Sequence, residues 1–234
     1  MGTPNWFLNE IMHAGDEHLD AAYVPAYDTK AGTDPADDLA ALQELGLNES
    51  HTLVDLGAGT GTFALAAAKI CRKVIAVDVS PEMLGILRDK MAQSDIQNIE
   101  TFQSGFLSYE HADEPADFVY SRHALHHLPD FWKTLALERI ALMMNPGGVF
   151  YLRDLVFSFE PGETEAVIDG WLDNAAISPD KGWTKTELIT HLQTEYSTYS
   201  WLLEPMLEKA GFTIQQVEHG ATRVHSAYTC VKKG

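Results

Sequence analysis

The chain has 234 residues, which is enough for one domain with a sizeable core, and its acidic residues outnumber its basic ones by 34 to 16. The resulting net charge of −18 makes nucleic acid and anionic membranes unfavourable partners and favours a small-molecule substrate. No apolar run reaches the roughly 18 residues of a membrane span, and no secretory signal pattern is visible, so a cytoplasmic monomer or homodimer is expected. Two cysteines, Cys71 and Cys230, indicate neither a disulfide framework nor a metal cluster.

Residues 1–50 predict an N-terminal helical lid, and residues 51–154 alternate between strands and helices. That alternation predicts an α/β core, a doubly wound and mostly parallel sheet with helices on both faces. Residues 155–210 break the alternation and predict a helical cap, after which residues 211–234 supply closing strands of the same core. The elements expected in the core are strand 51–56, helix 61–70, strand 73–78, helix 81–92, strand 97–102, strand 116–121, helix 131–143 and strand 148–154.

A strand that ends in a glycine-rich turn and runs into a helix is expected at Val54–Phe63. The glycines of this turn are Gly57, Gly59 and Gly61. Because glycine lacks Cβ and tolerates positive φ, such a turn brings backbone N–H groups close to a ligand. Thr62 stands where the dinucleotide fingerprint has its third glycine, and no Gly-Lys-Ser/Thr follows. The turn therefore predicts a cofactor site that differs from both of these nucleotide motifs.

Two acidic residues suggest what kind of cofactor the turn binds. Asp55 immediately precedes the turn, where its charge would repel a pyrophosphate and attract an ammonium or sulfonium group. Asp78 follows Gly57 by 21 residues and ends the next apolar run, a position that suits a ribose diol. Ser80 and Pro81 are favourable residues for the cap and first position of the following helix.

At these residues the chain resembles the class I S-adenosylmethionine-dependent methyltransferases. The resemblance rests on Val54–Gly61, on Val77–Leu84 and on Pro146-Gly147-Gly148. It implies a Rossmann-like, seven-stranded sheet with an antiparallel last strand, S-adenosylmethionine as cofactor with S-adenosylhomocysteine as product, and in-line methyl transfer to an O, N, S or C atom of a small molecule. The cofactor contacts expected from the motifs and from the strand ends are Tyr27, Asp55, Gly57, Ala58, Gly59, Gly61, Asp78, Val79, Met83, Ser104, Gly105, Phe106, Ser121 and Arg122.

Three histidines follow the fourth strand, and His123, His126 and His127 would share one face if the segment were helical. One interpretation is a general base, for which His126 and His123 are the candidates. A second is a metal set of His123, His127 and Asp130, which Pro129 disfavours because it disturbs the helix, so no metal is expected. The third is a structural role beside the substrate, which we expect for His127.

Substrate identity is expected to depend on the N-terminal region and on the insertion. The resemblance implies an N-terminal lid whose tyrosine touches the methionine end of the cofactor, so Tyr27 is expected near the cofactor and Tyr23, four residues earlier, near the substrate. The alternative is that both rings serve amphipathic packing. The insertion is rich in aromatic residues, and Trp171 and Trp201 are expected either to wall the substrate pocket or to form the core of the cap.

Arg153 ends the fifth predicted strand and so faces the ligand crevice if the register is right. It can bind a substrate carboxylate through two parallel hydrogen bonds, or it can pair with Asp154 or Glu160 of the chain itself. Two other functions stay open at this point. One is an NAD-dependent oxidoreductase, and the other is a module that binds S-adenosylmethionine or S-adenosylhomocysteine without catalysis.

Overall fold

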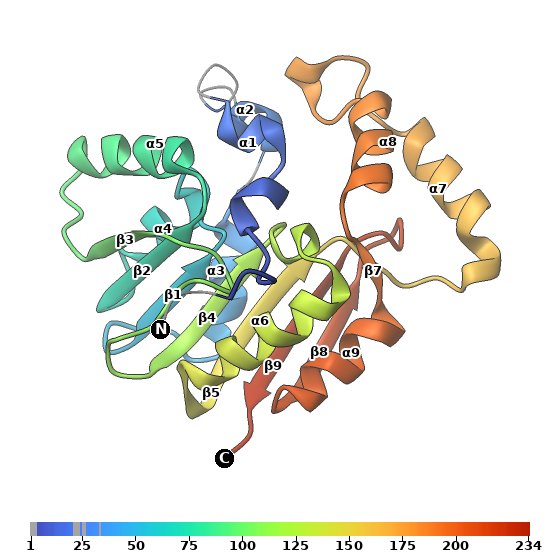
Figure 1. Ribbon diagram of the computed structural model, residues 1–234. Coiled ribbons are helices and arrows are strands. Elements are labelled where there is room, and N and C mark those ends of the chain that lie inside the picture. Colours follow the sequence, from blue (N-terminus) through green and yellow to red (C-terminus); the bar gives the residue numbers. More distant parts are fainter. Residues whose placement is uncertain (1–3, 21–23, 25–26, 33) are drawn as a thin grey trace.

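A seven-stranded sheet forms the centre of the molecule in the computed structural model, which describes residues 4–20, 24, 27–32 and 34–234 (Figure 1). The strand order is β3-β2-β1-β4-β5-β9-β8. All neighbours from β3 to β5 are parallel, whereas β9 is antiparallel to both β5 and β8, which confirms the expected methyltransferase-like sheet. The strands are β1 (Thr52–Leu56), β2 (Lys73–Asp78), β3 (Ile99–Gln103), β4 (Ala116–Arg122), β5 (Met144–Asp154), β8 (Phe212–His219) and β9 (Ser226–Lys232).

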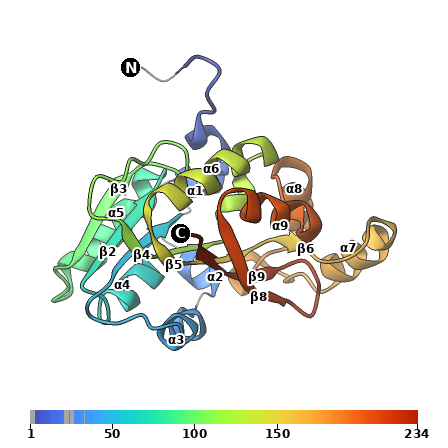
Figure 2. The same cartoon turned by 90° about the horizontal axis from the view of Figure 1, so that it is seen from below.

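Helices cover both faces of the sheet (Figure 2). Side chains alternate between the faces along each strand, so Leu53 packs with one helical layer and Val54 with the other. Apolar side chains fill the space between the sheet and each helical layer. All five β1 residues are therefore buried, as expected for a central parallel strand that is covered on both faces. One layer consists of α3 (Ala36–Glu44), α4 (Thr62–Ala67) and α5 (Pro81–Ala92), and the other of α6 (Asp130–Leu142) and α9 (Ser200–Lys209).

The predicted core elements lie close to the observed ones. Helix α5 spans the predicted residues 81–92, because Ser80 accepts a hydrogen bond from the Met83 amide at 3.1 Å and Pro81 occupies the first helical position. Strand β5 begins at Met144, four residues earlier than predicted, since Met144 already pairs with Ala116 across a register shift.

The segment between β5 and α9 contains two helices that project away from the sheet, α7 (Thr164–Asp173) and α8 (Lys185–Thr194) (Figure 1). Its two ends are joined by a parallel pair of short strands, β6 (Val156–Phe157) and β7 (Thr198–Tyr199). Thr184 and Glu187 form a reciprocal N-terminal cap of α8. Short 3₁₀ turns complete the segment, η4 (Pro161–Glu163) and η5 (Pro179–Lys181).

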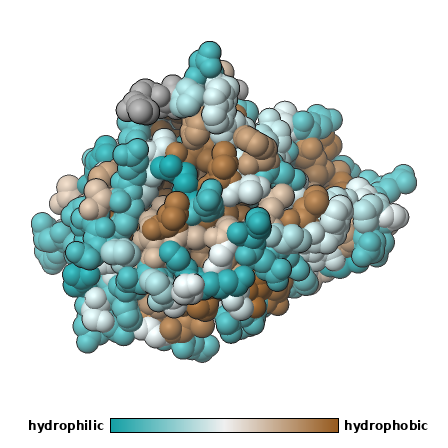
Figure 3. Space-filling model, turned by 60° about the horizontal axis from the view of Figure 1, so that its bottom comes forward, coloured by the Kyte–Doolittle hydropathy of each residue, from teal (hydrophilic) through white to brown (hydrophobic). Residues whose placement is uncertain are grey.

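The N-terminal region consists of short elements that lie over the carboxyl ends of the strands, namely η1 (Glu10–His13), α1 (Asp16–Leu19) and α2 (Tyr27–Ala31) (Figure 1). The residues that precede η1 pack against α6, where Trp6 stacks on Trp132 at a ring-centroid distance of 6.0 Å. Figure 3 shows hydrophobic residues in several patches among hydrophilic ones on the face that it draws. Within the described ranges, no helix combines the length and the apolar character that crossing a membrane requires.

Candidate active site

Two adjoining cavities lie at the carboxyl ends of β1, β2 and β4, where ligands bind in open α/β sheets. The larger one contains about 670 Å³ of empty space, part of it open to solvent. Both cavities are lined by Tyr27, Gly57, Gly59, Arg122 and His123. The larger cavity is further lined by Glu10, Ala14, His18, Asp78, Val79, Met83, Ser104, Gly105, Phe106, Ala124, His127 and Leu128. The smaller one is further lined by Asp28, Asp55, Ala58, Thr60, Thr62, Phe63 and Tyr120.

The glycine-rich turn requires glycine at two of its positions for steric reasons. Gly57 has φ +77°, and a Cβ there would lie 2.3 Å from the Cβ of Ala124. Gly61 has φ +79°, and a Cβ there would lie 2.1 Å from Leu87, so its role is helix packing rather than lining the cavity. The Gly57 and Ala58 amides both donate to the Val77 carbonyl, at 2.9 and 3.0 Å, which ties the turn to the end of β2.

Asp78 lies where the turn and β2 meet, and backbone groups orient its carboxylate. Oδ2 accepts a hydrogen bond from the Gly59 amide and Oδ1 accepts one from the Ser80 amide, both at 2.8 Å. Burial raises the pKa of Asp78, while these amides oppose the rise. Each carboxylate oxygen can accept a further hydrogen bond, and the residue lines the larger cavity, so the site fits a ribose diol.

Asp55 is buried below the turn with 1% of its surface exposed, and its Oδ2 has no hydrogen-bond partner among the described residues. Burial and, secondarily, the charge of Asp78 raise the pKa of Asp55 well above its usual range. An unpartnered buried acceptor that lines a cavity is suited to a cationic ligand. The residues around the turn therefore fit a cofactor that carries both a ribose and a positive charge.

The remaining cofactor contacts predicted after β2 and β3 also meet at the larger cavity, which Val79, Met83, Ser104, Gly105 and Phe106 line together. Phe106 is 7% exposed, so one face of the cavity is an aromatic ring held by the core. Sequence reasoning missed the residue that holds this loop: the Glu10 carboxylate accepts hydrogen bonds from the Leu107 amide at 2.9 Å and from the Ser108 hydroxyl at 2.8 Å.

The N-terminal region contributes further cavity residues that the motifs did not indicate. Ala14 and His18 line the larger cavity beside Glu10, and the His18 carbonyl accepts a hydrogen bond from the Ser80 hydroxyl at 2.6 Å. The predicted Tyr27 lines both cavities, and its ring contacts that of His18 at a centroid distance of 5.4 Å. Tyr23 lies outside the described residues. No local sequence pattern indicates Glu10 or His18, because their hydrogen-bond partners lie far away along the chain.

The three histidines after β4 occupy different environments. His123 precedes η3 (Leu125–His127) and has φ +49°, so the segment is not one helix and the three rings do not share a face. His123 lines both cavities, and its Nδ1 has no hydrogen-bond partner within the described part of the chain. Burial lowers the pKa of His123 to about 3, which keeps the ring neutral. Burial likewise lowers the pKa of His127, which lines the larger cavity and packs against His18.

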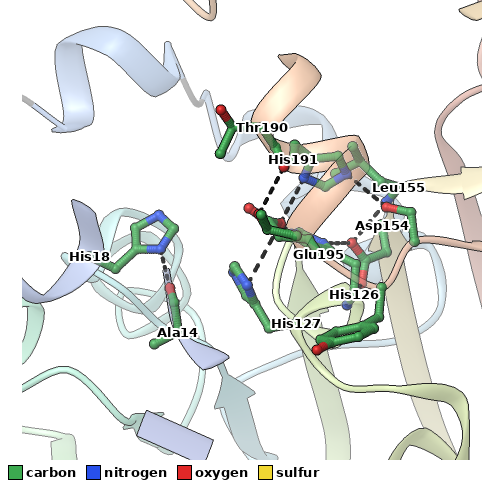
Figure 4. A network of polar contacts seen from close by, with 12 residues as sticks. Ala14, His18, His126, His127, Asp154, Leu155, Thr190, His191 and Glu195 are labelled. Atoms are coloured by element: carbon green, nitrogen blue, oxygen red, sulfur yellow. Dashed lines mark hydrogen bonds and ion pairs between the residues drawn. The ribbon is translucent and has the colours of Figure 1, made fainter. Parts of the chain in front are cut away.

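His126 is held between two carboxylates (Figure 4). Its Nδ1 lies 2.5 Å from Oδ1 of Asp154, and its Nε2 lies 2.9 Å from Oε2 of Glu195. Burial disfavours its charge, but the two carboxylates prevail and raise the pKa of His126 to about 9. The described residues that line the cavities do not include His126, and both of its ring nitrogens face protein carboxylates.

Arg153 pairs with neither Asp154 nor Glu160, the two partners considered from the sequence. Instead, its Nη2 and Nε lie 2.7 and 2.8 Å from Oδ1 of Asp38, a buried residue of α3. Nη1 of Arg122 lies 3.0 Å from the other oxygen of the same carboxylate. Asp38 thus fixes both arginines at the ends of β4 and β5, and the substrate role of Arg153 stays a prediction.

Three other predicted site residues lie apart from the cavities that the described residues line, and their roles stay predictions. Ser121 is fully buried in β4, with no hydrogen-bond partner for its hydroxyl in the described ranges. Trp171 lies on α7, where its ring contacts those of His191 and His225. Trp201 is 51% exposed and stacks on Tyr199 at a centroid distance of 5.5 Å.

Comparisons with known proteins agree with this geometry. A family model described as a methyltransferase domain matches residues 53–148, which include the glycine-rich turn, Asp78 and the three histidines. An uncharacterized methyltransferase of Bacillus cereus is 26% identical over 162 residues, which are 69% of each chain.

Solved structures of methyltransferases share the fold. A S-adenosylmethionine-dependent methyltransferase from Aquifex aeolicus matches with a TM-score of 0.62 and 21% identity over 91% of this chain and 98% of its own. A phosphoethanolamine N-methyltransferase 2 from Haemonchus contortus, solved with phosphomonomethylethanolamine and S-adenosylhomocysteine, matches with a TM-score of 0.73 and 17% identity over 97% of this chain and 61% of its own. The sheet, the site and the match of residues 53–148 to a methyltransferase domain agree with the resemblance seen in the sequence, and this part of the chain is similar to S-adenosylmethionine-dependent methyltransferases.

Proposed function

We propose that this enzyme transfers the methyl group of S-adenosylmethionine to a nucleophilic atom of a small molecule that enters the larger cavity. The observation that carries the proposal is the placement of Asp55 and Asp78 on either side of a turn that only glycine can form. Asp78 would accept hydrogen bonds from the two ribose hydroxyls, and Asp55 would face the positive charge of the methionine half. Phe106 would pack against the adenine.

Bound S-adenosylmethionine supplies an already activated methyl group, and its transfer leaves S-adenosylhomocysteine. The residues of this chain are therefore required mainly to align the acceptor with the methyl carbon and to exclude water. Ala14 and His18 cover the cavity from the N-terminal side, and His127 and Leu128 line it from the side of β4. An acceptor held among these four residues would lie next to the end of β4, where the family resemblance expects the methyl group.

The two predicted bases differ in what they can do. His126 has a pKa near 9 and two carboxylate neighbours, so it carries a proton at neutral pH and has no free nitrogen to accept another. His123 is neutral, lines both cavities and offers an unpartnered Nδ1 in the described structure. Its low pKa makes it a weak base, so we assign it the role of a hydrogen-bond acceptor that orients the nucleophile.

A small acceptor is supported by two further observations. The net charge of −18 disfavours nucleic acid as the methylated partner. The Haemonchus contortus structure, which shares the fold, was solved with the small molecule phosphomonomethylethanolamine. The acceptor atom (O, N, S or C) is left for experiment to assign.

The proposal is tested by incubating the purified full-length enzyme with methyl-labelled S-adenosylmethionine and a small-molecule extract freed of protein and nucleic acid. We expect label in one or a few small products together with S-adenosylhomocysteine, and roughly fivefold to tenfold less product with His123→Ala, since one oriented hydrogen bond is worth about 1–1.5 kcal/mol. His111→Ala is the control, because His111 bonds Tyr109 and Glu114 far along the chain from the turn. Absence of any labelled small product from this extract, with label entering a parallel protein or nucleic acid fraction instead, would contradict the small-molecule proposal.

A further inference from the structure

Three polar atoms from two distant segments of the chain converge beside the larger cavity (Figure 4). They are Nε2 of His126 and Nδ1 of His127, both on η3, and Oε2 of Glu195, which follows α8. The carboxylate oxygen lies 2.9 Å from the first nitrogen and 3.7 Å from the second. All three atoms lie within 4.8 Å of one another. This is not the set weighed from the sequence, because Asp130 instead binds Lys133 and Thr198.

Ordinary hydrogen bonds do not account for this convergence. Oε2 of Glu195 and Nδ1 of His127 are buried, and neither has a hydrogen-bond partner among the described residues. The short contacts to Oε2 from His126 and His191 therefore lack the directionality of hydrogen bonds, although they measure 2.9 and 2.7 Å. A buried polar atom without such a partner requires an explanation, and a bound ion is one that accounts for two such atoms at once.

The spacing of the three atoms is that of ligands around one metal ion. Nitrogen and carboxylate ligands of Zn²⁺ bind at about 2.0–2.2 Å, so neighbouring ligand atoms stand roughly 2.9 Å apart at a right angle and 3.4 Å apart in a tetrahedron. The distances of 2.9 and 3.7 Å from Oε2 bracket these values. Two imidazoles and one carboxylate suit first-row transition metals, whereas Mg²⁺ and Ca²⁺ prefer sites made of oxygen atoms.

The groups behind these atoms have the arrangement that supports metal ligands. Nδ1 of His126 lies 2.5 Å from the Asp154 carboxylate, and this contact directs Nε2 toward Glu195. Nδ1 of His191 lies 2.7 Å from Glu195, and its Nε2 lies 2.8 Å from the Ser197 hydroxyl, so the Glu195 carboxylate is held from its other side. The ion would displace the proton that His126 otherwise holds between these carboxylates. With both imidazoles neutral, the two carboxylates carry a charge of −2, which one divalent ion balances.

We propose that His126, His127 and Glu195 bind one divalent first-row transition metal ion, most suitably Zn²⁺, next to the methyl-transfer cavity. Three protein ligands leave a coordination position open, as in catalytic rather than structural metal sites. His127 lines the cavity, so that position is within reach of an acceptor. The metal would then bind the acceptor heteroatom and lower its pKa, so that its proton would pass to solvent. The freed lone pair would form the bond to the methyl carbon as the carbon–sulfur bond of S-adenosylmethionine breaks. This role rests on the proposed methyl transfer, whereas the metal site itself does not.

The test uses full-length protein without a polyhistidine tag, stripped with a chelator and titrated with Zn²⁺ by calorimetry and with Co²⁺ by visible absorption. We expect one ion per chain, and an intense Co²⁺ band that Zn²⁺ abolishes by competition. Glu195→Gln and His127→Ala should each weaken binding at least 100-fold, and Asp154→Asn roughly 10-fold to 100-fold, since the last change alters only a supporting contact. His111→Ala removes a histidine outside the cluster and should leave binding unchanged.

Absence of stoichiometric binding to the wild-type protein would overturn the proposal, whatever the folding of the variants. Equal binding by wild type, Glu195→Gln and His127→Ala would also overturn it, because the ion would then lie elsewhere. Binding of S-adenosylhomocysteine is measured on the same samples. Failure of that binding with an intact metal site would refute the proposed function alone, and the reverse result would refute the metal site alone.

Discussion

Replacement of Asp78 by Asn is the sharpest single perturbation of the cofactor site. The change keeps the shape of the side chain but removes its charge and one acceptor oxygen. In the native protein the two oxygens already accept hydrogen bonds from the Gly59 and Ser80 amides, so an Asn side chain cannot serve both amides and both ribose hydroxyls. Asn also presents an N–H donor to one of these two amides, so the ligand-free fold should lose some stability as well, which the unfolding measurement below reports.

The expected loss follows from the contacts that the charge would make. A hydrogen bond to a charged group contributes about 1.5–3 kcal/mol, and the variant weakens two of them while keeping a neutral acceptor for one. A net loss of about 2–3 kcal/mol corresponds to roughly 30-fold to 150-fold weaker binding. Ala at this position also leaves the Gly59 and Ser80 amides without their acceptor, so Asp78→Ala should be weaker still and less stable.

Calorimetric titration with S-adenosylhomocysteine measures this directly, with thermal unfolding of each apoprotein as a check on folding. Asp113→Asn is the matched control, since Asp113 forms an exposed ion pair with Lys73 outside the cavities of the described structure. Affinity of the control should equal that of wild type. If Asp78→Asn bound within twofold of wild type, the assignment of this carboxylate to the ribose would be wrong.

Three further outcomes follow from the geometry. Gly57→Ala should abolish cofactor binding and lower the unfolding temperature, because a Cβ at Gly57 meets another side chain. Gly147 has φ +81° and open space around it, so Gly147→Ala should lose only the stability that backbone strain removes. An equal loss of unfolding temperature in the two variants would contradict this account. The raised pKa of Asp55 means that the folded state holds its proton more tightly, so the contribution of Asp55 to stability should fall as pH rises above about 3.8. Asp55→Asn, measured by unfolding across pH beside wild type, should therefore gain stability relative to wild type as pH rises. Burial raises the thiol pKa of Cys71 to about 11 and that of Cys230 to about 12. Iodoacetamide should therefore alkylate neither thiol until the protein unfolds, as mass spectrometry can measure. Rapid labelling of the native protein would refute their burial.

The parts of the site that local sequence determines were predictable. Gly57 and Asp78 lie at strand ends fixed by short apolar runs, and Ser80 caps the next helix through its own neighbours. Chain order then brings the ends of parallel strands to one edge of the sheet, so these residues meet without any long-range information. The sheet order, including the antiparallel β9, agrees with the fold that the resemblance implies.

Contacts across long stretches of the chain were not predictable from one sequence. Asp38 accepts a hydrogen bond from Arg153, which lies 115 residues away along the chain, and Glu10 accepts one from the Leu107 amide, 97 residues away. The partner of His126 on its far side, Glu195, follows a helix whose position no local pattern specifies. Such pairs depend on how helices and loops pack over the sheet, which periodicity and spacing do not encode.

The central claim is that the cavity at the glycine-rich turn binds S-adenosylmethionine. Calorimetric titration of the purified wild-type chain with S-adenosylmethionine, S-adenosylhomocysteine and NADH tests it most directly. We expect micromolar, one-to-one binding of both adenosyl ligands, competition between them, and no heat from NADH. Binding of NADH without binding of either adenosyl ligand would contradict the account and support an NAD-dependent oxidoreductase instead.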